Sequence, residues 1–367
     1  MKKVSLFLTI AMLASMLAGC AGTPVVYYTE CTCPVGSHEV SVQETTPAAP
    51  ETEAPEVPAA EGALKTGLYI STGISDSVSA SADANGEAKY DVTMVAVLVD
   101  DNGVIQDCII DGISTSVAFD ASGVIGSDLA AAPQTKNELG ENYGMVAWGG
   151  AIAEWDEQAA ALASYAVGKT TEELRNGAID ETGKAPAGSD LASSATIYLG
   201  GYVSAIEAAV ANAQHLGAQA GDSLKLATVT GIDSSKSADT ENAGNAQLDA
   251  TVTALTMNGD VITSCVIDSV QAKVAFDATG VITSDVTAPV ATKNELGESY
   301  GMVAWGGAIA EWDEQAASFA SYVTGKTAAD VAGIAVDEGT KPTDADLTGS
   351  VTIAIGGFQA LIAKAAQ

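Results

Sequence analysis

The feature of this 367-residue chain that most constrains its fold is an internal repeat. Residues 135–160 and 292–317 differ at one position of 26, where Asn142 corresponds to Ser299, and the two segments stand at a constant offset of 157. Such self-similarity indicates two copies of one structural unit. The near-identity has two explanations, a shared ligand or a recent duplication, and one sequence does not separate them.

Weaker sequence similarity outside the near-identical block indicates where each copy begins and ends. We expect a first domain at 64–213, a short linker at 214–221 and a second domain at 222–367. The match downstream of the near-identical block begins at Asp190 in the first copy and at Asp346 in the second. Each copy has about 150 residues, which is enough for a hydrophobic core of its own.

Within a copy, the pattern predicts strands first and helices later. Residues 248–255 alternate apolar and polar side chains, as a half-buried strand does, and Asn258-Gly259 is typical of a hairpin turn into a second strand at 261–267. In the first copy, Asn102-Gly103 predicts the same turn.

Helical spacing follows in the later part of each copy. Thr170 and Glu173 have the spacing of a capping box for a short helix, and we expect a final helix to begin near Thr196. The helical stripe that precedes them in the first copy consists of Ile152, Trp155, Ala159, Leu162 and Ala166. The fold class is therefore α+β, two tandem domains in which an antiparallel sheet is covered by helices.

The N-terminus has the pattern of a targeting segment. Lys2 and Lys3 precede an apolar stretch at 4–17, which suits a signal peptide and is short for a membrane span. The stretch ends in Leu-Ala-Gly before Cys20, the pattern of a bacterial lipobox. We expect a lipoprotein signal peptide at 1–19 and a lipidated Cys20, which anchors the protein to the extracytoplasmic face of the cell membrane.

Residues 20–63 are rich in Pro, Thr, Glu and Ala, and this composition favours an extended, disordered tether. Cys31 and Cys33 lie in it, and their alternatives are a disulfide with another chain, a metal site or no role. Cys108 and Cys265 stand at matching places in predicted strands. We interpret them as buried small hydrophobic residues, with a redox pair as the alternative.

Charge and histidine content exclude several functions. Lys plus Arg number 15 and Asp plus Glu number 47, which gives a formal net charge of −32. A chain with this balance cannot neutralise a phosphate backbone, so we expect no nucleic-acid partner. The chain holds only 2 His, which leaves little room for a catalytic triad or a His-rich metal site, and we expect no catalytic residue and no metal.

All 4 Trp of the chain lie in the near-identical block. Trp155 and Trp312 fall on the helical stripe and are expected in the core. Trp148 and Trp305 precede Gly-Gly, where we expect a loop that presents an aromatic face to a ligand.

Taken together, these segments resemble the FMN-binding lipoproteins of Gram-positive anaerobes that serve extracellular electron transfer. The resemblance rests on the lipobox, the acidic tether, the paired α+β domains, the Lys-Asn-Glu-Leu-Gly-Glu-x-Tyr-Gly-Met block and the Asp-Leu-x-x-Ser-x-Thr-Ile segment. It covers nearly all of the chain after the tether. In that family a flavin transferase attaches FMN through its phosphate to a threonine, in a motif that reads approximately Asp-x-x-Ser/Thr-Gly-Ala-Thr.

The resemblance implies covalent FMN on Thr196 and Thr352, up to two flavins per chain. The first motif departs from the family only by Ser194 in place of Gly, whereas the second keeps Asp346 and Thr352 and changes the residues between them. From the residues alone, a threonine at the expected helix start is an N-cap. The remaining residues expected to contact the cofactor are Asp190, Asp346, Met145, Trp148, Met302 and Trp305.

The function implied is that of a membrane-anchored extracytoplasmic electron carrier, an electron-transfer flavoprotein rather than a classical enzyme. Its partners would be the flavin transferase, a membrane electron donor such as a quinone-linked dehydrogenase, and extracellular electron acceptors. The alternative is a non-redox surface binding or structural lipoprotein with duplicated ligand-binding domains. A hydrolase is a distant third hypothesis, because no nucleophile and base can be paired in the sequence.

Overall fold

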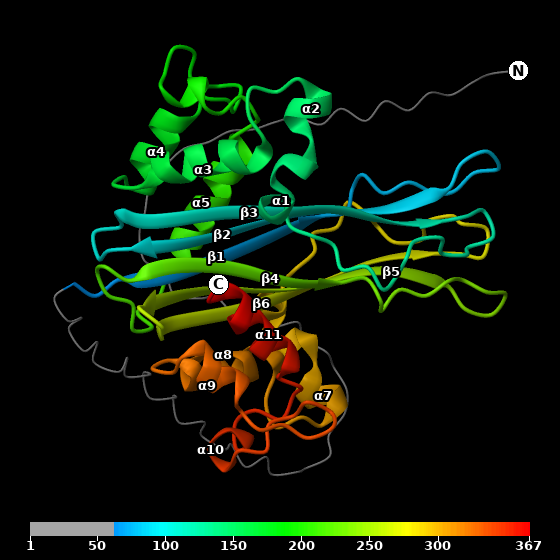
Figure 1. The fold of residues 1–367 in the computed structure, drawn as a ribbon. Coiled ribbons are helices and arrows are strands. Elements are labelled where there is room, and N and C mark those ends of the chain that lie inside the picture. Colours follow the sequence, from blue (N-terminus) through cyan, green and yellow to red (C-terminus); the bar gives the residue numbers. More distant parts are fainter. Residues whose placement is uncertain (1–61) are drawn as a thin grey trace, which may run out of the picture. The chain divides into compact units, whose positions relative to one another are not determined.

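The computed structural model describes residues 62–367. The expected signal peptide, the lipidation site Cys20, the tether, Cys31 and Cys33 lie outside these residues. Within the described part, two similar segments each begin with a three-stranded antiparallel sheet and continue into helices, which confirms an α+β fold with antiparallel sheets (Figure 1).

The strands pair in chain order, β1-β2-β3 in the first copy and β4-β5-β6 in the second. The elements of the first copy are β1 (Lys65–Gly73), β2 (Gly86–Val99), β3 (Ile105–Phe119), α1 (Lys136–Leu139), the 3-10 helix η1 (Gly140–Tyr143), α2 (Met145–Gly149), α3 (Trp155–Ala166), α4 (Thr171–Ala178), the 3-10 helix η2 (Leu191–Ser193) and α5 (Gly200–Ala211). The elements of the second copy are β4 (Ser223–Gly231), β5 (Gly244–Asn258), β6 (Val261–Phe276), α6 (Lys293–Leu296), the 3-10 helix η3 (Gly297–Tyr300), α7 (Met302–Gly306), α8 (Trp312–Val323), α9 (Ala328–Ala332), α10 (Ala345–Thr348) and α11 (Gly356–Ala365).

Local signals in the sequence are accurate at the hairpins and at α4. The turn between β5 and β6 falls at Asn258-Gly259, and Gly259 adopts a φ of 58°, in the left-handed region that a tight hairpin turn requires. Thr170 caps α4 and Glu173 bonds back to it, as the capping-box spacing predicts. The stripe that predicts α3 starts too early, because α3 begins at Trp155 and Ile152 lies in the exposed segment before it.

The long strand β2 is buried on both of its faces. Met94, Ala96 and Leu98 point to one side, into a core that also holds the apolar side chains of β4 and β5. The residues between them, such as Val95 and Val97, point to the other side, into a core formed with α3 and α5. Alternation along one strand therefore supplies two separate cores.

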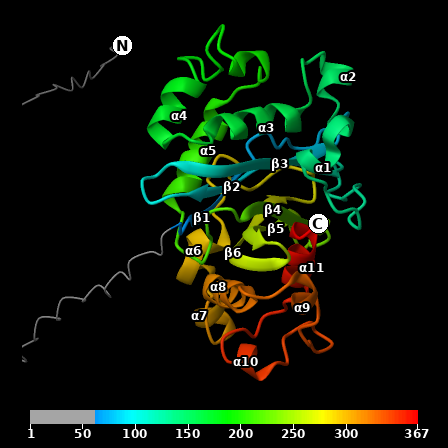
Figure 2. The same cartoon turned by 60° about the vertical axis from the view of Figure 1, so that its left-hand side comes forward.

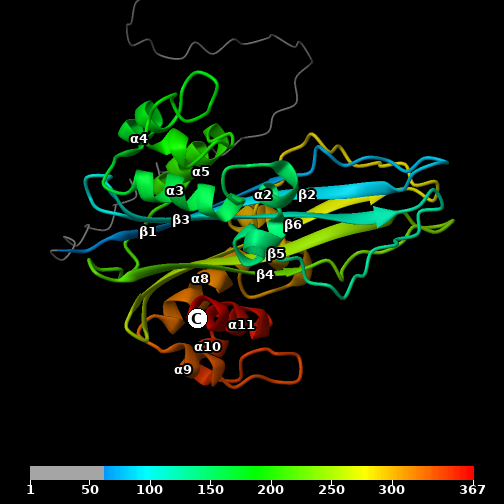
Figure 3. The ribbon, with the colours of Figure 1, turned by 45° about the horizontal axis from the view of Figure 1, so that its top comes forward.

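The described chain thus has four layers, helices on each outside and the two sheets face to face in the middle (Figures 2 and 3). Helices α3 and α5 cover the outer face of the first sheet, while α8 and α11 cover the outer face of the second. The core between the sheets is shared by both copies, and each copy adds a core of its own under its helices.

Reciprocal contacts join the copies at one end of the sheets. Phe119 and Phe276 stack with ring centroids 4.0 Å apart and an interplanar angle of 1°. The amide of Ala80 donates to the carbonyl of Gly280, and the equivalent amide of Ala238 donates to Gly123, both at 2.8 Å. Each copy therefore offers the other the same surface, as in an isologous interface.

Replacing Phe119 with Ala is expected to lower the free energy of unfolding by about 3–5 kcal/mol, because the fully buried ring leaves a cavity in the shared core. Unfolding in urea, followed by circular dichroism, should stay a single transition, since the two sheets share that core. Val124→Ala, at a half-exposed position, is the control and should change stability little. Two separate transitions, only one of them shifted, would contradict the shared core.

Candidate functional site

Thr196 and Thr352, the threonines expected to carry a cofactor, are each held by one glutamine of the preceding long helix. The side-chain oxygen of Gln158, a buried residue of α3, accepts from the amide of Thr196 at 2.8 Å, from its hydroxyl at 3.3 Å and from the amide of Ile197 at 3.2 Å. In the second copy, Gln315 of α8 bonds Thr352 at the same 2.8 and 3.3 Å. The backbone of each threonine is therefore fixed by a buried side chain.

Neither threonine is a helix N-cap, so that expectation is wrong. The final helix α5 begins at Gly200, with Leu199 at the N-cap, and α11 begins at Gly356. Helix α5 starts later than expected because the amides of Leu199 and Gly200 donate to the carbonyl of Gly183, at 2.8 and 3.0 Å, instead of to carbonyls four residues earlier. As a result Thr196 is exposed and Thr352 is half-buried.

The final helices begin with glycine pairs. No heavy atom lies within 4 Å of where a Cβ would stand on Gly201 or on the equivalent Gly357. The first amides of a helix lack intrahelical acceptors, and this end of the helix carries a partial positive charge. In α5 the carbonyl of Gly183 already accepts from the first of these amides, so what remains for an anion is the open space at Gly201 and Gly357 and the field of the helix.

Trp148 and Trp305 lie in short helices rather than in the expected loops. They belong to α2 and α7, and their side chains are 86% and 92% exposed. The start of α2 is held by the buried carboxylate of Glu154, which accepts from the amides of Met145 and Val146 at 2.8 and 3.0 Å.

Other exposed apolar residues lie within a few positions of each tryptophan in the sequence. They are Val146 and Ile152 in the first copy and Val303 and Ile309 in the second. Met145 and Met302 pack instead against the helical cores, half-buried.

The threonine loop and the segment after α2 meet at the N-terminal end of α3. While the oxygen of Gln158 accepts from Thr196, its amide nitrogen donates to the carbonyl of Ala153 at 2.8 Å, in the connection between α2 and α3. Gln315 and Ala310 repeat this bond at 2.8 Å. A residue that sequence reasoning missed therefore links each threonine loop to the connection that follows the tryptophan helix.

Asp190 and Asp346 stand at the surface, at the start of a short helical turn in each copy. The carbonyl of Asp190 accepts from the Ser193 hydroxyl at 2.6 Å, and the amide of Asp346 donates to Asp344 at 2.9 Å. Within residues 62–367, no hydrogen bond joins either carboxylate to its threonine.

A second pair of carboxylates, missed by the sequence reasoning, is buried between β3 and α1 and between β6 and α6. Asp268 accepts from the amides of Ser269 and Asn294 at 2.7 and 3.1 Å, and Asp111 makes the equivalent bonds. Burial raises the pKa of Asp268 to about 6, against the hydrogen bonds to it, which lower it. Burial also raises the pKa of Asp111. Their recurrence at the end of the matching Cys-x-Ile-Asp segments was the available signal.

The two strand cysteines are buried, as expected. Burial raises the pKa of both thiols, Cys108 and Cys265, to about 12, so the reactive thiolate is disfavoured.

Residues 62–367 contain no group of three or more His, Cys, Asp and Glu placed to hold a metal ion. In the same part of the chain, no helix combines the length and the apolar character needed to span a membrane.

Comparison of the chain with protein-family models, with curated proteins and with solved structures gives no match.

The raised pKa of Asp268 predicts a pH dependence of stability. Between its ordinary value of 3.8 and about 6, the folded protein binds more protons than the unfolded chain, so stability falls as pH rises through this range. Asp268→Asn should remove that fall, worth up to about 3 kcal/mol, in urea unfolding measured from pH 4 to pH 7. The exposed Asp83→Asn is the control. An unchanged pH profile in Asp268→Asn would show that the carboxyl titrates normally.

Proposed function

We propose that this protein is a membrane-anchored, extracytoplasmic electron carrier that holds FMN covalently at Thr196 and Thr352. The observation that carries the proposal is the recurrence, in both copies, of an exposed or half-buried threonine whose backbone is fixed by a buried glutamine. An exposed tryptophan lies on the short helix that precedes the glutamine's helix in the chain. The acceptor-like motifs around both threonines support the same assignment.

The residues present fit such a group in three respects. The hydroxyl of Thr196 donates to the Gln158 oxygen at 3.3 Å, and the residue stands at the surface where a transferase can reach it. Gly201, the second residue of α5, leaves room for a phosphodiester near the positive helix end, whereas the ring of Tyr198 stands over Gly200. The exposed ring of Trp148, on the short helix before α3, offers an aromatic face for stacking.

Covalent attachment also suits the charge of the chain. A net charge of −32 opposes binding of an anionic flavin by electrostatic attraction, and a covalent link makes the local concentration of the ring independent of that repulsion. FMN, when attached, supplies reversible electron transfer. The protein's own residues position it: Gln158 and Gln315 hold the attachment loops, and Trp148 and Trp305 face the solvent.

The two proposed flavins belong to opposite helical layers, because each attachment loop follows the helices of its own copy (Figure 1). Two sheets separate those layers, so each flavin would meet outside partners on its own face. We infer a flavin transferase, a quinone-linked membrane donor and extracellular acceptors as those partners, with Cys20 as the lipid anchor.

The second candidate function is that of a non-redox surface lipoprotein with duplicated ligand-binding domains. A cavity of about 580 Å³ between the two copies favours it, because this volume is in the range of small-molecule sites. The cavity is lined by neither Thr196 nor Thr352, so it is a separate site from the proposed flavin attachment.

Co-expression of residues 62–367 with a flavin transferase should add two FMN groups, visible in the intact mass and in the absorption spectrum. Thr196→Ala and Thr352→Ala should each remove one adduct, and the double substitution both. Thr279→Ala, at a surface turn, is the control and should keep both. An unshifted mass without flavin absorbance would sink the proposal, and adducts that survive the double substitution would place the sites elsewhere.

Gln158→Leu should lower modification of Thr196 several-fold and leave Thr352 unaffected, because it frees only the first attachment loop. The second copy is the internal control in the same molecule. Peptide mapping of the modified protein measures both sites. Equal modification of the two threonines would show that the glutamine does not position the acceptor.

A further inference from the structure

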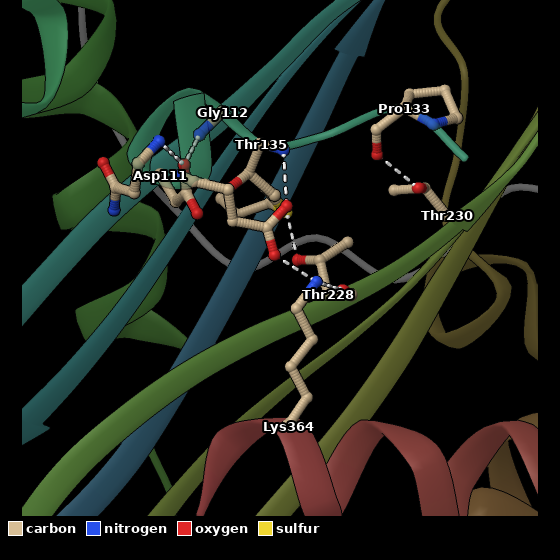
Figure 4. Close-up of polar contacts among 10 residues, drawn as sticks. Asp111, Gly112, Pro133, Thr135, Thr228, Thr230 and Lys364 are labelled. Atoms are coloured by element: carbon tan, nitrogen blue, oxygen red, sulfur yellow. Dashed lines mark hydrogen bonds and ion pairs between the residues drawn. The ribbon is translucent and has the colours of Figure 1, made fainter. Parts of the chain in front are cut away.

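Two equivalent junctions join the copies, and a lysine side chain spans one of them. Lys364 extends from α11, donates to the carbonyl of Thr228 on β4 at 2.6 Å and forms an ion pair with the carboxylate of Glu138 in α1 (Figure 4). The other carboxylate oxygen of Glu138 accepts from the amide of Thr135 at 2.9 Å, in a capping box. An alkylammonium group thus joins α11 and β4 of the second copy to α1 of the first.

The equivalent junction joins α5 and β1 of the first copy to α6 of the second. Glu295 is in the place of Glu138, and one of its oxygens accepts from the amide of Thr292 at 2.8 Å. Ala208 is the counterpart of Lys364, because each lies eight residues after the first residue of its helix, Gly200 in α5 and Gly356 in α11.

The strand partner of that junction follows from the register of the sheets. Gly73 of β1 pairs with Asp91, as Gly231 of β4 pairs with Asp249. Counting back from these glycines places Ile70 at the position of Thr228.

Because alanine ends at Cβ, this second junction lacks the ammonium group, and a cavity of about 580 Å³ lies there. A smaller cavity of about 310 Å³ remains in the first copy; Asn137 and Asp156, the counterparts of Asn294 and Asp313, line it, but Glu138 does not. Ile70 and Glu295, the counterparts of the two groups that hold Lys364, both line the larger cavity. Asn212, the C-cap of α5 and four residues after Ala208, lines the larger cavity as well and donates to the carbonyl of Leu68 at 3.1 Å.

The lining of this larger cavity carries negative charge only. Glu295, Asp268 and Asp313 contribute three carboxylates, and the lining includes no Lys, Arg or His. Within residues 62–367, Glu295 has no ion-pair partner, whereas its counterpart Glu138 pairs with Lys364. Oδ1 of Asp313 is buried without a hydrogen bond, as is Oδ1 of its counterpart Asp156 in the first copy. A buried carboxylate oxygen without a donor is costly, and a cationic donor in the cavity would reduce that cost.

We propose that this cavity is a binding site for a small organic amine, whose primary ammonium group takes the place that the Lys364 ammonium group takes at the other junction. The ammonium group pairs with Glu295 and donates to the carbonyl of Ile70. Its alkyl chain lies against the apolar walls, which include Leu68, Leu216 and Val266. A diamine binds more tightly than a monoamine, since a second ammonium group meets the remaining carboxylates.

The chemistry favours an amine over a metal ion or an anion. The described residues form no metal-ligating cluster, and the three carboxylates repel any anion. An ammonium group on a flexible alkyl chain is the group that the molecule itself uses at the equivalent position. The site is independent of the proposed flavin attachment, because neither Thr196 nor Thr352 lines the cavity.

Isothermal titration of the purified full-length chain, without flavin and at about 0.15 M salt to screen surface charge, tests the site. The probes are 1,5-diaminopentane, n-butylamine and, as the uncharged control, 1-butanol. We expect one saturable amine site per chain, tighter for the diamine, and no heat from the alcohol. A folded chain that binds neither amine overturns the proposal.

Two substitutions locate the site. Ala208→Lys should abolish binding, because the chain then supplies its own ammonium group. Glu295→Gln should weaken binding at least tenfold while it keeps the capping box, which accepts either residue. Ala329→Lys, an exposed position of α9 outside the cavity lining, adds the same charge as a control and should change affinity little. Unchanged affinity in either Ala208→Lys or Glu295→Gln overturns the proposal.

Lys364→Ala provides the reciprocal test. Removing this lysine leaves Glu138 without its partner, so the first junction should become a second amine site and the stoichiometry should rise from one to two. Circular dichroism checks that the variant is folded. A stoichiometry that stays at one in the folded variant contradicts the equivalence of the two junctions on which the proposal rests.

Discussion

The packing of one sheet face against the other is the interaction on which this structure depends. A three-stranded sheet such as β1-β2-β3 has two apolar faces, and the helices of its own copy cover one of them. The other face, which includes Met94 and Leu98, would meet water in an isolated copy. Because burying apolar surface is the main favourable contribution to folding, the second copy completes the first. The repeat in the sequence is thus a requirement of the fold.

This arrangement also determines where chemistry can take place. Since the inner faces are occupied, the helical layers are the surfaces that remain available, and the near-identical block belongs to them. The block supplies core residues such as Trp155, the positioning residue Gln158 and the exposed Trp148 within a short stretch of chain. Substitution at one of its positions would disturb packing and the candidate site together, which is one physical reason for two copies to stay alike there.

Local features of the fold could be predicted from the sequence, and tertiary ones could not. The strands of β5 and β6, the turn at Asn258 and the cap at Thr170 follow from side-chain periodicity and turn preferences, which act over a few residues. The start of α5 depends on the distant carbonyl of Gly183, and the place of Thr196 depends on Gln158. Alternation along a strand predicts a buried face but does not say what covers it. For the candidate site, the sequence indicated the threonines and tryptophans but gave no sign of the glutamine that links each threonine to the segment after the tryptophan helix.

The near-symmetry of the two copies has an evolutionary consequence. In a homodimer, one gene position supplies both symmetric contacts, so every substitution appears twice. Here the two contacts are encoded at separate positions of one gene. The copies do not dissociate on dilution, because one polypeptide carries both. Lys364 and its counterpart Ala208 show that the copies have already diverged at such a position. A duplicated chain therefore has the reciprocal contacts of a symmetric dimer, while each of its two copies can be substituted independently.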